Sequence, residues 1–236
     1  MTKDTLAAPA EAVKPLAHIS SPDVINLLRD VIMAYTHHHN DLQIEGASMG
    51  GSIALGIRSN LDDYGRLVGY AGGNIWALTV IFGRVGERMR KPVRVSLFKS
   101  KVGTEEPRQP FAPDANFNHG PTTALLKRVL AMSLSHPFRL SVAQVGDDTH
   151  YEIDPSNAEF NVQGDYIKAI RNIFVAVGRN RGRTIYVHLA GMSEEDERRE
   201  EQHAEALRMS PAVSPLVDRD KELALLREAK ERGVKT

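Results

Sequence analysis

The chain contains one long segment twice, and this duplication constrains its fold more than any other feature. GDYIKAIRNIFVAVGRNRGRTIYVHL (164–189) aligns without a gap to GGNIWALTVIFGRVGERMRKPVRVSL (72–97), so that Phe174 falls on Phe82 and Gly178 falls on Gly86. TALLKRVLAM (123–132) likewise matches INLLRDVIMA (25–34). A match of apolar positions in two separate segments predicts that one structural unit occurs twice.

The element order of the unit follows from its periodicity. In the first copy Ser20 offers a helix N-cap, Pro22 follows in the first turn, and apolar residues recur at helical spacing up to Tyr35. Alternating apolar residues predict strands within 41–48, 52–59 and 93–98, and a second apolar helical stripe runs from Ile75 to Met89. We therefore predict an α+β fold with two tandem domains, each a three-stranded sheet with helices on one face.

Domain boundaries follow from changes in composition. We expect a flexible N-terminal arm over 1–19, the first copy over 20–98, a Pro-rich linker over 99–120, and the second copy over 121–191. Residues 192–236 hold 12 acidic and 9 basic side chains and predict charged helices. These helices either associate with a partner or a second copy of the chain, giving a homo-oligomer, or pack back on the domains as solvated surface.

The two copies differ most in a glycine-rich loop. After Asn60 the first copy has LDDYGRLVGYAG, ending at Gly72, whereas after Asn157 the second has AEFNVQG, five residues shorter and ending at Gly164. Gly69 and Gly72 lack a Cβ atom that would keep a ligand away from the backbone. A helix is expected to start directly after them, and a helix N-terminus favours an anion. The loop is thus predicted to bind a sugar–phosphate backbone.

The residues Gly65, Arg66, Leu67, Val68, Gly69, Gly72, Ile75 and Leu78 resemble the GxxG signature of type II KH domains. The resemblance covers about 22–98, and 121–190 as a degenerate copy without the loop. It implies tandem KH-like folds and non-catalytic binding of single-stranded RNA, clamped at the loop. KH loops commonly carry Lys or Arg between the two glycines, whereas this chain has Tyr70 and Ala71 there.

The candidate RNA-binding residues form three groups. The loop and its flanks include the expected groove walls, with residues near Ile53–Ile57 opposite. Basic residues at the end of the following helix, and their counterparts in the second copy, would extend a positive surface although the chain's formal charge is zero. The full set is Arg66, Val68, Gly69, Tyr70, Ala71, Gly72, Gly73, Asn74, Ile75, Arg84, Arg88, Arg90, Lys91, Arg179, Arg181 and Arg183. Trp76 belongs either to the core or to the RNA-facing surface.

Other classes of function find less support in the sequence. A dinucleotide-binding loop follows an apolar strand, whereas the residues before this loop, SNLDDYGRL, are polar and helix-like. GK[ST] is missing, and cysteine is absent. The His37–His38–His39 run is interpreted as solvated helix-end histidines rather than a metal site, and Asp62 and Asp63 are expected to cap the short helix before the loop. We predict no cofactor, no metal and no enzymatic activity.

The expected partner is therefore RNA, and mRNA in a ribonucleoprotein is the anticipated kind. The expected location is the cytoplasm of a bacterial or phage-infected cell, since no signal peptide or membrane-length apolar run occurs. The duplicated arrangement and charged tail also resemble KH-like RNA-binding proteins of large-genome phages. The alternative is a protein–protein scaffold of KH-like folds that has lost RNA binding.

Overall fold

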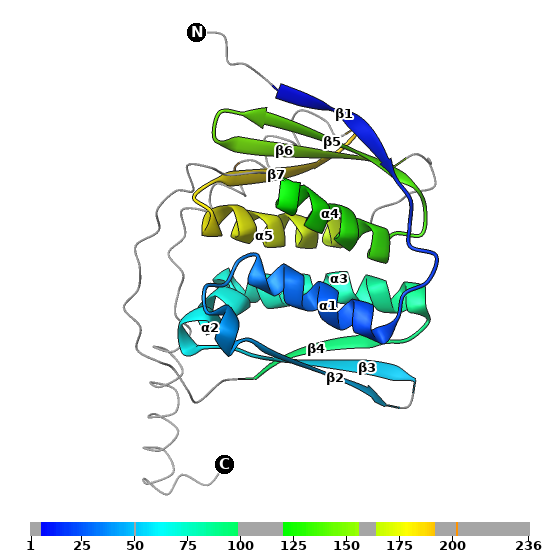
Figure 1. Cartoon of the computed structure of the whole chain (residues 1–236), viewed down its shortest axis with the longest axis vertical. Coiled ribbons are helices and arrows are strands. Elements are labelled where there is room, and N and C mark those ends of the chain that lie inside the picture. Colours follow the sequence, from blue (N-terminus) through cyan, green and yellow to red (C-terminus); the bar gives the residue numbers. More distant parts are fainter. Residues whose placement is uncertain (1–5, 50, 99–119, 156–163, 192–201, 203–236) are drawn as a thin grey trace, which may run out of the picture.

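The computed structural model describes residues 6–49, 51–98, 120–155, 164–191 and 202, and shows an α+β fold of two small sheets with helices between them (Figure 1). The linker predicted over 99–120 and the tail predicted over 192–236 lie almost wholly outside these residues. The first half contains β1 (Leu6–Val13), α1 (Ser21–Met33), β2 (Gln43–Met49), β3 (Ser52–Arg58), α2 (Leu61–Val68), α3 (Gly73–Met89) and β4 (Val93–Phe98). The second half contains α4 (Gly120–Ser133), β5 (Phe138–Val145), β6 (Asp148–Pro155), α5 (Gly164–Asn180) and β7 (Thr184–Leu189).

The elements form four layers. The sheet β2–β3–β4 lies at one end, α1 and α3 cover it, α4 and α5 lie against those helices, and the sheet β1–β5–β6–β7 closes the other end (Figure 1). The helix stripes predicted from periodicity face inward: Val24, Leu28 and Val31 of α1 are fully buried. None of the helices within the described ranges is both long and apolar enough to cross a bilayer.

The two copies have the same strand pairing. In the first sheet Gln43 pairs with Arg58, and in the second sheet Arg139 pairs with Asp154, which is the same antiparallel register shifted by 96 residues. The parallel pairs β3–β4 and β6–β7 also correspond, with Ile53 beside Val93 and Thr149 beside Ile185. The duplication inferred from the sequence is therefore present in the backbone.

Two equivalent glycines show how closely the packing corresponds. A Cβ atom on Gly86 would lie 2.7 Å from the carbonyl oxygen of Lys91, and one on Gly178 would lie 2.7 Å from the carbonyl oxygen of Arg183. In both copies the missing side chain lets the long helix pass directly against the turn that leads into the next strand. Each turn is closed by the same hydrogen bond, in which Lys91 or Arg183 donates its N–H to the glycine carbonyl.

The copies are not separate globular units, because their apolar side chains form one continuous core. α3 packs along α5, and polar contacts join the copies at both ends of this interface. Arg88 of α3 donates to the carbonyl of Ala131, at the end of α4, at a distance of 2.5 Å. Asn180, the counterpart of Arg88 on α5, donates to the carbonyl of Ala34, at the end of α1, over 3.3 Å.

One expectation from the sequence needs correction, and one contact was not predicted. Residues 6–13 of the predicted flexible arm form strand β1, which pairs antiparallel with β5, so the second sheet has four strands instead of three. The packing of each copy's helices on the helices of the other copy was not predicted from the sequence. Both differences concern long-range pairing, which local periodicity does not encode.

Candidate nucleic-acid interface

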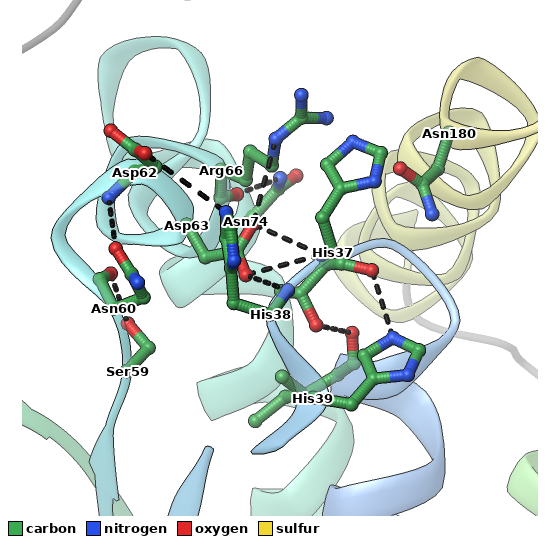
Figure 2. A network of polar contacts seen from close by, with 12 residues as sticks. His37, His38, His39, Ser59, Asn60, Asp62, Asp63, Arg66, Asn74 and Asn180 are labelled. Carbon is green, nitrogen blue, oxygen red and sulfur yellow. Dashed lines mark hydrogen bonds and ion pairs between the residues drawn. The ribbon is translucent and has the colours of Figure 1, made fainter. Parts of the chain in front are cut away.

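The short helix α2, which leads into the glycine loop, is held by two polar side chains (Figure 2). Asn60 is its N-cap: its Oδ1 accepts from the N–H of Asp62 at 3.0 Å, while its Nδ2 donates to Asp41 at 2.8 Å. The carboxylate of Asp63, only 1% exposed, accepts from the N–H groups of His37 at 3.0 Å and His38 at 2.7 Å.

These contacts correct the expected roles of the two aspartates. The side chain that caps α2 comes from Asn60, not from Asp62 or Asp63. Asp63 instead ties α2 to the loop that follows α1, and Arg66 lies 3.6 Å from its carboxylate. The glycine loop therefore starts from a helix that is anchored to the first copy's core.

The backbone turns sharply between α2 and α3, and no continuous helix crosses the loop. α2 ends at Val68, and Gly69 follows with φ 71° and ψ 177°. Ala71 and Gly72 also have positive φ values, 48° and 80°. Glycine adopts this region readily, whereas the left-handed conformation of Ala71 is uncommon for a residue with a Cβ atom.

The two glycines have different surroundings. A Cβ atom on Gly69 would lie 2.6 Å from Cγ of Asn74, so this glycine makes room for a side chain of the same molecule. Asn74 uses that space to donate its Nδ2 to the carbonyl of Arg66 at 2.8 Å, which joins the end of α2 to the start of α3. A Cβ atom on Gly72 would meet no described atom within 4 Å, so this side of the loop is open.

The exposed aromatic side chains of this region lie in and just after the loop. Tyr70 is 52% exposed and Trp76 is 37% exposed, which is unusual for the largest side chains. Val68 and Ile75, the predicted groove walls, are half-buried. The other predicted wall is wrong, because Ile53, Leu55 and Ile57 are buried beneath the helices and face no groove.

The predicted basic residues divide between two ends of the molecule. Arg84, Arg88, Arg90 and Lys91 lie toward or beyond the C-terminal end of α3, roughly 16–27 Å from its first residue at 1.5 Å per residue. Arg84 pairs with Glu87 at 2.7 Å, and Arg88 donates to two carbonyls, those of Ala131 and Leu16. These four residues therefore do not form one surface with the loop.

The C-terminal end of α5 lies at the same end of the molecule as α2. Asn180 lies near His37 and Arg66 in Figure 2, and its bond to Ala34 places the end of α5 beside the end of α1. Arg179, exposed, and Arg181 belong to this end, whereas Arg183 is mostly buried and pairs with Asp147. The structure thus brings part of the second copy's basic segment close to the first copy's α2.

Two residues that the sequence did not single out lie against the start of α3. Nζ of Lys168 on α5 is 6.0 Å from the centre of the Trp76 ring. Nδ2 of Asn172, one turn further along α5, is 3.6 Å from the position that a Cβ of Gly73 would take. The ungapped alignment of the two copies could have indicated the contact between Trp76 and Lys168. These two residues are equivalent in the alignment, and equivalent residues meet where two related helices cross.

The three consecutive histidines mainly contribute backbone groups. His37 and His39 are exposed and His38 is half-buried. The backbone N–H groups of His37 and His38 bind Asp63, whereas the ring of His39 contacts the carbonyl of Thr36. Burial, and next the charge of Arg66, lower the pKa of His37 below its ordinary value. No group of three His, Asp or Glu side chains with metal-binding geometry occurs in the part of the chain that the structure describes.

Comparison of the chain with models of protein families, with curated proteins and with solved structures found no match.

Proposed function

We propose that this protein binds single-stranded RNA without catalysing a reaction, through the Gly69–Gly72 loop and the start of α3. The observation that carries the proposal is the loop itself: a kinked turn, open at Gly72, with an exposed Tyr70, leads directly into a helix of 17 residues. The N-cap of that helix is a glycine, which offers no side chain to the first-turn N–H groups. A phosphate group would accept hydrogen bonds from such a terminus.

The fold class supports the same proposal. The order α1, β2, β3, α2, loop, α3, β4 is the order that the resemblance to type II KH domains implies, and the glycines occupy the α2–α3 junction. We therefore infer a KH-like unit in the first copy and a KH-like scaffold without a GxxG loop in the second. In this arrangement the sugar–phosphate backbone passes over Gly72, and Tyr70 is placed to stack on a base, worth about 1–3 kcal/mol.

Replacing Tyr70 and Ala71 by aspartate tests the site. Both positions are exposed, and Asp tolerates the positive φ of position 71, so the fold should persist. Two carboxylates at the loop should repel phosphates and abolish binding of a fluorescein-labelled oligouridylate of about 12 nucleotides, measured by anisotropy at low salt.

The matched control places the same two charges on β1. Ala10→Asp with Ala12→Asp alters exposed positions on the sheet at the other end of the four layers, and should leave RNA affinity unchanged (Figure 1). Circular dichroism confirms that both variants are folded. Equal RNA affinity of the loop variant and the parent would overturn the site. Absence of RNA binding by the parent would favour the scaffold role instead.

A further inference from the structure

The start of α3 is a meeting point of the two copies. α3 and α5 pack together, and the equivalent residues Trp76 and Lys168 face each other there, with the ammonium group 6.0 Å from the ring centre. Side chains on a helix lean toward its N-terminus, so the Trp76 ring covers the turn that begins at Gly73. The ammonium group of Lys168 therefore lies beside the first turn of α3.

Asn172 adds an unsatisfied polar group at the same place. Its side chain is 92% buried, lies against Gly73, and its Oδ1 has no hydrogen-bond partner among the described residues. A buried amide oxygen without a partner destabilises a fold by about 1–3 kcal/mol, and such groups need an explanation. The Asn172 atom that faces Gly73 is the amide nitrogen, so Asn172 marks the close contact between α5 of the second copy and the start of α3.

The loop itself lacks a cation. Tyr70 and Ala71 stand between the two glycines, and the nearest basic residue before them, Arg66, lies 3.6 Å from the carboxylate of Asp63. Lys168 is exposed, and its ammonium group lies 6.0 Å from the centre of the Trp76 ring. Lys168 thus offers a phosphate at α3 a positive charge from the other copy.

We propose that the RNA site is shared by the two copies: Lys168 of the second copy supplies the cation for a phosphodiester bound at the first copy's loop and the start of α3. This inference rests on the proposed RNA-binding function and extends it. It gives the second copy, which has no glycine loop of its own, a direct part in recognition.

Lys168→Ala in the full chain tests the shared site with the same labelled oligouridylate. One lost phosphate contact should reduce the slope of log K against log salt by about 0.7 and weaken binding about three- to tenfold at 100 mM salt. Lys168→Arg retains the charge and should restore the slope. Arg139→Ala, which removes an exposed cation from β5, should change neither quantity.

Tryptophan fluorescence gives a second measurement, because Trp76 is the chain's single tryptophan. RNA should quench its emission in the parent, and Lys168→Ala should shift the quenching curve to higher RNA concentration. If the loop aspartates abolish binding while Lys168→Ala leaves the salt slope unchanged, the shared site is wrong and the RNA function stands. If the loop aspartates have no effect or the parent binds no RNA, both proposals fail.

Discussion

The two copies agree in the packing of the elements they share, and they differ in one connection and in one additional strand. Strand register, the glycine that brings the long helix against the next turn, and the polar bond from that helix to the opposite copy all recur. Only the first copy has the glycine loop in its sequence, and α2 has no counterpart among the described residues of the second copy, while β1 is an additional strand of the second sheet. Interior packing resists change because a core tolerates few alterations of volume, whereas a connection can gain or lose a helix.

The sheet edges extend this contrast. β1 covers the edge of β5, while β2, the counterpart of β5, has no second strand neighbour in the described ranges. An uncovered edge presents unpaired backbone groups. The two ends of the molecule are therefore unequal in backbone hydrogen bonding, although their sheets share one pairing scheme.

The largest effect is expected from substituting the equivalent glycines. Gly86→Ala and Gly178→Ala each force a Cβ atom to 2.7 Å from a backbone carbonyl oxygen, and neither backbone can move without shifting a strand. We expect each substitution to lower the free energy of unfolding by about 2–4 kcal/mol. Urea denaturation followed by circular dichroism measures both values.

Gly83→Ala is the matched control in the same helix as Gly86. A Cβ atom at position 83 meets nothing within 4 Å. Because alanine stabilises a helix more than glycine does, the free energy of unfolding of this variant should rise by about 0.5–1 kcal/mol. Clearly different losses for Gly86→Ala and Gly178→Ala would show that the copies are equivalent in geometry but not in energetics.

A smaller effect is expected where the copies meet. Arg88→Ala removes bonds of 2.5 and 2.6 Å to the carbonyls of Ala131 and Leu16, and should cost about 1–2 kcal/mol of stability. Asn180→Ala removes one bond of 3.3 Å to Ala34 and should cost about 0.5 kcal/mol. Thermal unfolding measures the stability lost by each variant. A loss for Asn180→Ala as large as that for Arg88→Ala would contradict this prediction.

The smallest effect concerns the loop after α1, which is longer in the first copy than its counterpart after α4. Since folding lowers the pKa of His37 below its ordinary 6.5, the unfolded chain binds the proton first. The contribution of neutral His37 to the stability of the fold is present above pH 6.5, and it is lost as the pH falls through that value toward the pKa of the folded state. His37→Gln should therefore flatten the decline in melting temperature between pH 7 and pH 5. An identical decline in both proteins would exclude His37 as a contributor.

The sequence predicted local structure well and long-range structure poorly. The α1 stripe of Val24, Leu27 and Val31 and the strand alternation of Ile53, Leu55 and Ile57 are buried as periodicity indicated. Strand β1 was not predicted, because its alanine-rich sequence has no apolar alternation and its partner β5 lies more than a hundred residues away.

The candidate site was predicted only in part, for a related reason. The glycines and the helix after them were evident from spacing, and the kink at Gly69 confirms a break between two helices. The burial of Asp63 and the approach of Lys168 depend on which helices pack together. Charge counting also placed Arg84 and Lys91 with the loop, because it ignores the 1.5 Å rise of each helical residue.

The continuous core has a consequence for how such a chain can change. Deleting either half would remove α3 or α5, and the remaining long helix would expose the side that packs on its counterpart. Absence of the glycine loop from one half is therefore compatible with the fold, while absence of the half itself is not. The second copy has no glycine loop of its own, but it provides the surface on which the helices of the first copy pack.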